Sequence, residues 1–351
     1  MSKSLIAIIC IVATVALVAH NLSYASDEFD SFVAVHKRNY NSVEEYEFRR
    51  NIFMNNLDYI EEFNSQEHTW WLGVNQFTDM TDEEFRQFLG YKPQKTGLKP
   101  LDTIKAPENV INDEAIDWRE KGYVRPVKNQ GTCGSCWAFA TNFGVEAAWV
   151  KYNQEKLGKT VSPPDLSEQM LMDCDMKNGS CLGGLMQWAY AFYQENCPVF
   201  EKDYPYEEQD ADCRNEGHQC ATDKVLDWYD IKKYDDNSLR HALSLAPVVI
   251  GIQAENMEFR SYAGGIISEA TCGYRPDHAV GIVGEYFNTT IVDGQEVTIP
   301  VWKVRNSWGA SWGDEGYVNV ERKEILVSGL NVGVCGINMD PSIPTFMEYY
   351  N

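Results

Sequence analysis

The amino-acid sequence predicts an α+β protein with a helical lobe and a β-rich lobe, preceded by a separate helical segment. From Asp27 to about Leu89, apolar residues recur at helical spacing among charged ones. A second helical stretch runs from Cys136 to Tyr152. Beyond about Leu226, short runs rich in Val and Ile stand among Gly and Pro, which is typical of strands. A helical half followed by a β half favours two lobes with a cleft between them.

Residue spacing places the elements within these parts. The apolar face of the N-terminal helix is expected to consist of Phe48, Ile52, Phe53, Leu57, Ile60 and Phe63. In the last third of the chain we expect strands at Pro247–Ile252, His278–Val283, Val301–Arg305 and Tyr317–Val320. Asp293-Gly294 is a hairpin turn signal between two such runs, and 291–300 would lengthen that hairpin.

Composition and charge exclude one class of partner. Apolar residues make up 44% of the 351-residue chain, which is ordinary for a globular protein with a core. The formal net charge of -22 argues against nucleic-acid binding, because contacts with phosphates require a basic surface. Such acidity fits a protein that works at low pH, where many surface carboxylates are protonated.

The first 25 residues have the pattern of a secretory signal peptide. Lys3 is followed by an apolar run from Leu5 to Ala19, and the small residues Ser23 and Ala25 mark a cleavage site after Ala25. The alternative is a membrane anchor, but the run is shorter than the roughly 20 residues that cross a bilayer. We therefore expect the chain to enter the secretory pathway.

A linker divides the rest of the chain. Residues 90–111 contain three prolines, two glycines and four lysines, a composition typical of an exposed, cleavable connector. The predicted organisation is a signal peptide at 1–25, an N-terminal segment at 26–109 and the main domain at 110–351.

The cysteine count points to one special thiol. Cys10 would leave with the signal, so nine of the ten cysteines remain, all of them after the linker. Secreted proteins favour disulfides, and an odd number implies either an intermolecular bridge or one free, reactive cysteine.

Cys136 is the candidate for that reactive cysteine. The run Gln130-Gly-Thr-Cys-Gly-Ser-Cys136 leads straight into the predicted helix and places Cys136 at its N-terminus. There the helix dipole and free backbone N–H groups favour the thiolate, which is the competent nucleophile. The Cys133-x-x-Cys136 spacing also suits a redox pair, half of a zinc site or a structural disulfide, and spacing alone does not decide among these.

His278 and Asn306 are the candidate partners of that nucleophile. His278 opens an apolar strand in the β half, although a lone histidine in such a place is more often structural. Asn306 follows 28 residues later in the run Asn-Ser-Trp-Gly. A side-chain amide can fix the tautomer of the imidazole, and Trp308 can shield that bond from water, which is the logic of a catalytic triad.

These motifs resemble the papain family of cysteine proteases, specifically its cathepsin L-like branch. The segments around Cys136, His278 and Asn306 occur in the order of that family. The N-terminal segment resembles the branch's propeptides at Glu45, Arg49, Phe53, Asn56, Ile60 and Asn64, and again at Gly73, Asn75, Phe77 and Asp79.

The resemblance implies a papain-like fold, with a helical left lobe, a β-barrel-like right lobe and the active site in the cleft. It implies a cysteine endopeptidase that works through a thioester acyl-enzyme, with Cys136 as nucleophile and His278 as base. Gln130 and the backbone N–H of Cys136 would form the oxyanion hole. Residues 26–109 would be an inhibitory propeptide that is removed at acid pH, with Asp79 as the candidate sensor.

The same resemblance assigns substrate-binding residues. Gly183 and Gly184 would let a substrate backbone approach closely. The main specificity pocket would be lined by Leu185, Met186, Gly251 and Ala279, with Asp340 at its far end. That pocket would accept Leu or Phe on its apolar wall and Arg or Lys against the carboxylate. A solvated loop aspartate is the equally weighted alternative for Asp340.

Disulfides and sequons complete the expected covalent structure. By resemblance the bridges are Cys133–Cys181, Cys174–Cys213 and Cys272–Cys335, and we propose Cys197–Cys220 as a fourth. Asn178-Gly-Ser and Asn288-Thr-Thr are N-glycosylation sequons, and each asparagine is a candidate for carrying a glycan.

Two rival functions are weighed against a peptidase of this kind. An inactive homologue or inhibitor would lack the nucleophile or base, and an exopeptidase would need a segment that blocks one end of the cleft. Here Cys136 and His278 are both present, and we find no segment that would block the cleft.

No metal or other cofactor is implied. The expected partners are protein and peptide substrates, the chain's own propeptide and inhibitors of the cystatin type, but no nucleic acid and, after signal removal, no membrane. We expect a monomer located in a lysosome, a vacuole or the extracellular space.

Overall fold

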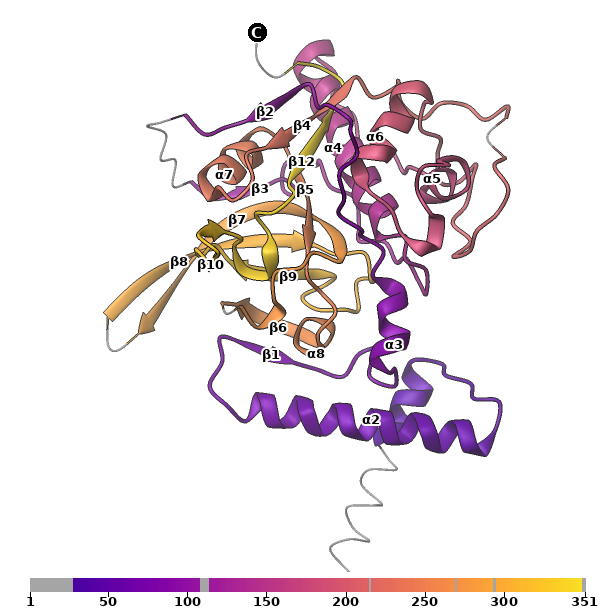
Figure 1. Ribbon diagram of the computed structural model, residues 1–351, viewed down its shortest axis with the longest axis vertical. Coiled ribbons are helices and arrows are strands. Elements are labelled where there is room, and N and C mark those ends of the chain that lie inside the picture. The colour runs from indigo at the N-terminus through magenta and orange to yellow at the C-terminus, as the bar shows by residue number, and fades with distance from the viewer. Residues whose placement is uncertain (1–27, 108–113, 215, 269, 293–294, 349–351) are drawn as a thin grey trace, which may run out of the picture. The chain divides into compact units, whose positions relative to one another are not determined.

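The computed structural model describes residues 28–107, 114–214, 216–268, 270–292 and 295–348. They form two units, which we treat separately (Figure 1). The first contains 28–66 and 74–81, and the second contains 67–73 and 82–348. The predicted signal peptide and the Asp293-Gly294 turn lie outside the described residues.

The first unit is built on helix α2 (Val43–Asn64). Its N-terminus is capped by Ser42, whose hydroxyl accepts a hydrogen bond from the Glu45 N–H. The buried face of α2 consists of Phe53, Leu57, Ile60 and Phe63. A short helix at 28–35 packs two phenylalanine rings against Phe53. Phe48, expected on the apolar face, is instead 52% exposed.

Asp79 joins three parts of the first unit. Its Oδ1 accepts a hydrogen bond from Nη2 of Arg38 and its Oδ2 accepts one from the Tyr40 hydroxyl, both at 2.9 Å. Its backbone carbonyl accepts a third from Nη1 of Arg49 on α2 at 3.1 Å. The buried carboxylate therefore ties the segment 74–81 to the start of the unit and to the long helix.

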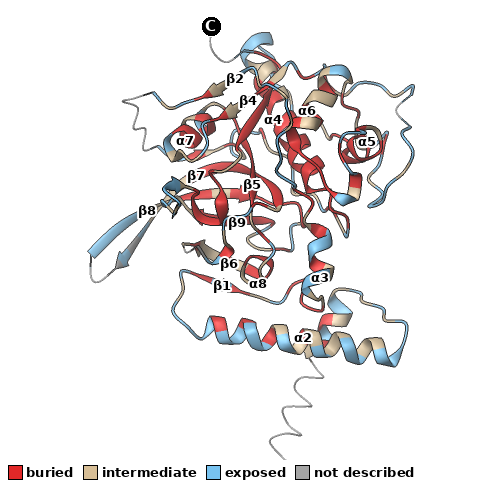
Figure 2. Cartoon of the chain, viewed as in Figure 1, coloured by how far each residue is buried: buried red, intermediate tan, exposed pale blue. Residues whose placement is uncertain are grey.

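The helical part of the second unit contains α4 (Cys136–Leu157), α5 (Glu168–Cys174) and α6 (Met186–Glu195). Most of α4 is buried, since it is enclosed by the other helices on one side and by the sheet on the other (Figure 2). Shorter helices are α3 (Asp82–Phe85), α7 (Asp236–Leu245) and α8 (Met257–Arg260).

The other part of the second unit is a ten-stranded sheet with the order β1-β6-β9-β8-β7-β5-β12-β4-β2, to which β3 is added through β7. Its strands are β1 (Trp70–Leu72), β2 (Asp102–Ile104), β3 (Ile116–Asp117), β4 (Asp227–Ile231), β5 (Val248–Ile252), β6 (Tyr262–Ile267), β7 (His278–Val292), β8 (Gln295–Arg305), β9 (Tyr317–Glu321) and β12 (Ser342–Thr345). Strands β10 (Leu326–Val327) and β11 (Leu330–Asn331) form a separate hairpin.

The expected mixture of helical and sheet-rich parts is confirmed. Each of the four strands expected in the last third is present, but β7 and β8 are much longer than the apolar runs that indicated them. They pair as one antiparallel hairpin from Gly281–Arg305 out to Val292–Gln295. Its outer end extends away from the rest of the sheet (Figure 1).

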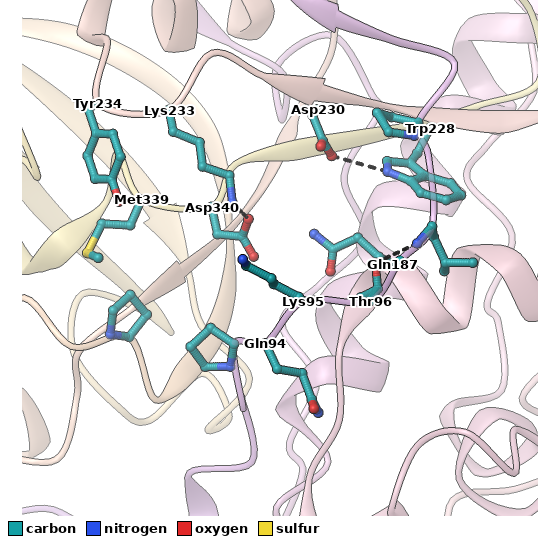
Figure 3. Close-up of a pocket in the computed structure, with 15 residues that line it drawn as sticks. Gln94, Lys95, Thr96, Gln187, Trp228, Asp230, Lys233, Tyr234, Met339 and Asp340 are labelled. Carbon is teal, nitrogen blue, oxygen red and sulfur yellow. Dashed lines mark hydrogen bonds and ion pairs between the residues drawn. The ribbon is translucent and has the colours of Figure 1, made fainter.

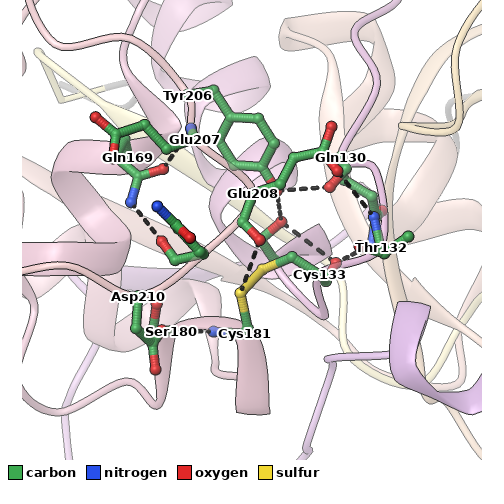
Figure 4. The surroundings of a disulfide bond; sticks show 12 residues. Gln130, Thr132, Cys133, Gln169, Ser180, Cys181, Tyr206, Glu207, Glu208 and Asp210 are labelled. Carbon is green, nitrogen blue, oxygen red and sulfur yellow. Dashed lines mark hydrogen bonds between the residues drawn. A yellow bond between two sulfur atoms is a disulfide. The ribbon is translucent and has the colours of Figure 1, made fainter.

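Four disulfides join cysteines of the second unit, and they are the four expected pairs: Cys133–Cys181, Cys174–Cys213, Cys197–Cys220 and Cys272–Cys335. The first lies beside Tyr206 and Glu208, a few residues from the start of α4 (Figure 4). Among the described residues, no helix is both long enough and apolar enough to cross a membrane.

Candidate active site

Cys136 is the first residue of α4 and the one cysteine of the described chain without a disulfide. Its side chain is completely buried. The sulfur accepts a hydrogen bond from the backbone N–H of Ala279 at 3.5 Å. Ala279 follows His278 directly in β7. Its hydrogen bond to the sulfur therefore places the candidate base, His278, beside the start of α4.

His278 is the first residue of β7, and it is held from two directions. Its Nε2 lies 2.7 Å from Oδ1 of Asn306. Trp308 stacks on the imidazole with a centroid distance of 4.6 Å. Within the described chain, Nδ1 of His278 is buried and has no hydrogen-bond partner. The ring is therefore fixed by one nitrogen and has the other available for proton transfer.

Gln130 is fully buried beside this pair. Its Nε2 donates to the carbonyls of Cys133 and Phe88, each at 2.8 Å. The hydroxyl of Ser307 donates to its Oε1 at 2.7 Å and so fixes which end of the amide faces the cleft. The sequence analysis did not single out Ser307, although its position next to Asn306 was a signal that could have indicated it.

Residues 88–92 lie across the site, and we call them the cleft strap. The N–H of Gly184 donates to the Gly90 carbonyl at 2.8 Å, and the Lys92 N–H donates to the Gly184 carbonyl at 3.3 Å. On the other side, the Tyr91 N–H donates to the carbonyl of Asp277 at 2.9 Å. The cleft strap thus pairs with Gly184, which the sequence analysis assigned to a substrate backbone, and also with Asp277, which it did not consider.

Gly183 leaves room for the cleft strap. Its φ is +108°, and a Cβ there would lie 2.4 Å from the Gly90 carbonyl oxygen. A side chain at this position would therefore both strain the backbone and displace the bound segment.

The ring of Tyr91 occupies the predicted specificity pocket. It belongs to the same buried cluster as Leu185, Met186 and Ala279. A Cβ on Gly251 would lie 2.4 Å from the Tyr91 ring, so the glycine makes space for it.

Asp340 lies at the far end of this pocket with two partners already in place. Its Oδ2 accepts a hydrogen bond from the Tyr91 hydroxyl. Its Oδ1 forms an ion pair with Lys233 (Figure 3). The sequence analysis considered a carboxylate without a cation and did not identify Lys233 or Tyr91. The Asp340 side chain is 17% exposed and borders a cavity of about 580 Å³.

Burial makes both reacting groups neutral in this covered state. It raises the pKa of the Cys136 thiol to about 11, although N–H groups of Ala279 and Gly90 favour the thiolate. Burial also lowers the pKa of His278 to about 4 against the opposing hydrogen bond to Asn306. Desolvation thus opposes the thiolate that the helix N-terminus favours, and it is the larger of the two effects in this covered state.

The two sequons differ in their surroundings. Asn178 is buried, and its Nδ2 donates to Oδ2 of Asp175 at 2.7 Å and to the Leu185 carbonyl at 3.2 Å. Asn288 lies on the outer part of the β7–β8 hairpin, opposite Ile299. In the described part of the chain, no group of three His, Cys, Asp or Glu residues is arranged to hold a metal ion.

Two family models match this chain. Residues 112–345 match the family model described as papain family cysteine protease, and residues 29–85 match the cathepsin propeptide inhibitor domain (I29). The chain is 36% identical over 325 residues to the cysteine protease XCP2 of Arabidopsis thaliana, covering 90% of this chain and 85% of that protein. It is 34% identical over 314 residues to papaya proteinase 4 of Carica papaya, covering 88% and 84%.

Solved structures of precursors show the same architecture. The digestive procathepsin L2 proteinase from the larval midgut of Tenebrio molitor superimposes with a TM-score of 0.78 at 32% identity. The match covers 92% of this chain and all of that one.

Proposed function

Since this chain belongs to the papain family of cysteine proteases, we propose that it is an endopeptidase made as a zymogen, with Cys136 and His278 as its catalytic residues and Asn306 as the residue that positions His278. The observation that carries this proposal is the free thiol at the start of α4, beside a histidine whose other nitrogen is bound to Asn306. A buried, unpaired thiol next to an oriented imidazole is the arrangement that nucleophilic catalysis requires.

The proposed reaction transfers an acyl group from a peptide to Cys136 and then to water. With the cleft open, His278 takes the thiol proton, and the thiolate attacks the scissile carbonyl. The oxyanion accepts hydrogen bonds from Nε2 of Gln130 and the backbone N–H of Cys136. His278 then protonates the leaving amine, and a thioester remains. A water molecule deprotonated by His278 hydrolyses the thioester, which releases the carboxylic acid and restores the thiol.

Asn306 is a positioning residue in this scheme. Its Oδ1, 2.7 Å from Nε2 of His278, holds the imidazole so that Nδ1 faces the reaction. Trp308 covers this hydrogen bond and keeps water from competing for it. Ser307 acts in the same way on Gln130, because its hydroxyl fixes the amide with Nε2 available for the oxyanion.

The cleft strap provides the proposed inhibition. The Phe88 carbonyl occupies the Gln130 donor, and Tyr91 fills the specificity pocket. Burial beneath the cleft strap also keeps Cys136 and His278 uncharged. Removing this segment would admit water, which lowers the cost of charging both groups and permits the thiolate–imidazolium pair.

We further propose activation at acid pH in a lysosome, a vacuole or the extracellular space. Asp79, which forms an ion pair with Arg38 inside the first unit of the propeptide, is the candidate sensor of this change. Protein and peptide substrates, the propeptide itself and cystatin-type inhibitors are the proposed partners of a monomeric enzyme.

A nucleophile variant tests the proposed function. The purified precursor is shifted from pH 7 to about pH 5, treated with a thiol-reactive epoxide, and assayed on an unstructured protein. We expect label on Cys136 and internal cleavage after the acid step, and at least a ~10³-fold loss of kcat/KM in Cys136→Ser. Activity above a few per cent in Cys136→Ser, or products trimmed only from a chain end, would contradict the endopeptidase assignment.

A further inference from the structure

The segment that follows the cleft strap has two parts of opposite character. Residues 93–100 form a loop, and β2 (Asp102–Ile104) forms the edge strand of the sheet. Both precede the boundary at residue 109 that the sequence analysis placed before the main domain. They therefore belong to the predicted propeptide, although only the first part is loosely held.

The loop 93–100 has few anchors besides Leu98, which packs against the buried cluster around Tyr91. Five of its eight residues are exposed, and among the described residues its backbone N–H groups donate only within the loop, from Leu98 to the Thr96 hydroxyl at 3.1 Å. Beneath it lies the cavity of about 580 Å³ that also borders Trp228 and Asp340 (Figure 3). Because this loop pairs with no strand and borders a cavity, local unfolding of the loop costs little free energy. The unfolded loop can then enter the cleft of a protease.

Strand β2, in contrast, is integrated into the sheet. It pairs in parallel with β4, with Ile104 opposite Ile231. The Leu101 N–H donates to the Trp228 carbonyl and the Lys232 N–H donates to the Ile104 carbonyl, both at 2.9 Å. The Ile104 side chain is 1% exposed. Beyond the strand, the Ala106 N–H donates to the Ser238 hydroxyl at 2.9 Å.

We propose that activation cuts the loop 93–100 and that β2 stays in the sheet of the active enzyme as its N-terminal strand. The step hydrolyses one peptide bond with one water molecule and leaves a carboxylate and an amine. This inference rests on the proposed function, since a second copy of the active enzyme is the protease that we assign to the cut. The active form would then begin between Pro93 and Leu101, before the predicted boundary.

The two sides of the cut have different fates for a physical reason. The cleft strap is held by Gly184, Asp277 and Gln130, groups that substrates of the open cleft also use. Once cut, it is no longer covalently linked to the peptidase and can be displaced. Losing β2 would instead expose the edge of β4 and the buried surface around Ile104, which a soluble sheet avoids.

Identifying the N-terminus of the labelled enzyme tests this inference. The full-length precursor is activated at about pH 5, samples are taken over time, and molecules labelled on Cys136 by the epoxide are analysed by intact mass and N-terminal sequencing. We expect the first labelled species to begin within 93–101 and to contain Ile104. A first labelled species that begins at residue 105 or later would overturn the inference. Absence of any labelled species would instead count against the proposed function.

Two variants separate strand pairing from loop sequence. Ile104→Ala removes buried surface from β2 and should shift the N-terminus beyond residue 105, whereas Lys105→Ala, an exposed neighbour, should leave it unchanged. Hydrogen exchange gives a second readout that does not depend on the variant: in labelled wild-type enzyme the Lys232 amide should exchange at least ~10-fold more slowly than in labelled Ile104→Ala. Equal exchange in both enzymes would show that β2 does not stay paired.

Discussion

At the residue scale, the predicted specificity pocket differs from its sequence-based description because Lys233 and Tyr91 both contact Asp340. Asp340 was expected to meet a substrate cation, but Lys233 already pairs with it. Burial lowers the pKa of Lys233, but the charge of Asp340 and the hydrogen bond to it outweigh that effect together with other nearby acidic groups, so the pKa is raised overall and the lysine stays protonated. An arginine in a substrate must therefore displace Lys233 before it gains the carboxylate, whereas an aromatic hydroxyl can bind as Tyr91 does.

Removing Lys233 should make Asp340 available to a basic substrate. In Lys233→Met we expect kcat/KM for peptides with Arg in the residue before the scissile residue to rise about 10-fold relative to Leu peptides, because a partly buried charge pair is gained. Matched peptide pairs assayed at pH 6.5 give the ratio. The control Lys232→Met removes a neighbouring, exposed lysine that pairs with Asp235 and should keep the wild-type ratio.

A second substitution decides whether Asp340 carries the change. Lys233→Met combined with Asp340→Asn should return the Arg-to-Leu ratio to the wild-type value or below it. If the double variant keeps the increased ratio, another group binds the arginine and Asp340 does not form the end of the pocket.

At the element scale, the two sequons occupy opposite kinds of site. Asn178 lies in a loop before α6, and its amide is committed to Asp175 and Leu185. Asn288 lies on the outer part of the β7–β8 hairpin. Its side chain forms no hydrogen bond with any residue that the structure describes. It faces the same side as Ile299 and the partly exposed Val297, which a glycan would cover.

We therefore predict a glycan on Asn288 and none on Asn178. Precursor secreted by eukaryotic cells is treated with a peptide N-glycosidase, and the asparagine converted to aspartate is located by mass spectrometry. Asn288→Gln should lose the glycan and change the free energy of unfolding by less than ~0.5 kcal/mol. Asn178→Gln should lose no glycan but cost about 1–3 kcal/mol, because buried partners lose their hydrogen bonds. Conversion at Asn178 would contradict this assignment.

At the scale of the whole molecule, the sequence could predict what short segments determine. Cys136, His278 and Asn306 stand in distinctive local motifs, and the strands follow from runs of Val and Ile. The contacts of the cleft strap could not be predicted, because they join distant residues. Tyr91 of the cleft strap and Asp340 are 249 positions apart. The same holds for the ion pair between Lys233 and Asp340, which are 107 positions apart. The sequence likewise could not indicate that burial raises the pKa of the Cys136 thiol, because burial depends on the folded chain and not on the helix alone.

Buried carboxyl groups connect the whole fold to pH. Burial raises the pKa of Glu146 on α4 to about 7, as it does for Glu201 and Asp277. Glu146 accepts a hydrogen bond from the Leu166 N–H at 3.1 Å and lies 3.8 Å from Lys128, whose closest partners include Glu168 at 2.9 Å. Both contacts favour the carboxylate, but burial outweighs them, so below about pH 7 the native state favours the protonated form of Glu146.

The sign of the resulting pH dependence is fixed by this shift. In the unfolded chain Glu146 ionises near pH 4.5, and in the native state near pH 7. Its contribution to stability is fully present below about pH 4.5 and is lost as the pH rises through 7. Asp277 and Glu201 act in the same direction, so these groups favour the fold under the acid conditions proposed for activation.

Glu146→Gln should remove the part of this dependence that belongs to Glu146. Glutamine keeps an oxygen for the Leu166 N–H but carries no charge, so the variant avoids the cost of a buried carboxylate. Measured on Cys136→Ser precursor to prevent self-cleavage, the variant should be more stable than its parent at pH 8 by on the order of 2 kcal/mol, with little gain at pH 4.5. Glu195→Gln, at an exposed position on α6, should show no such change. A gain of equal size at both pH values would mean that Glu146 is not protonated in the acid fold, and a loss at pH 8 would mean that its charge is needed by Lys128.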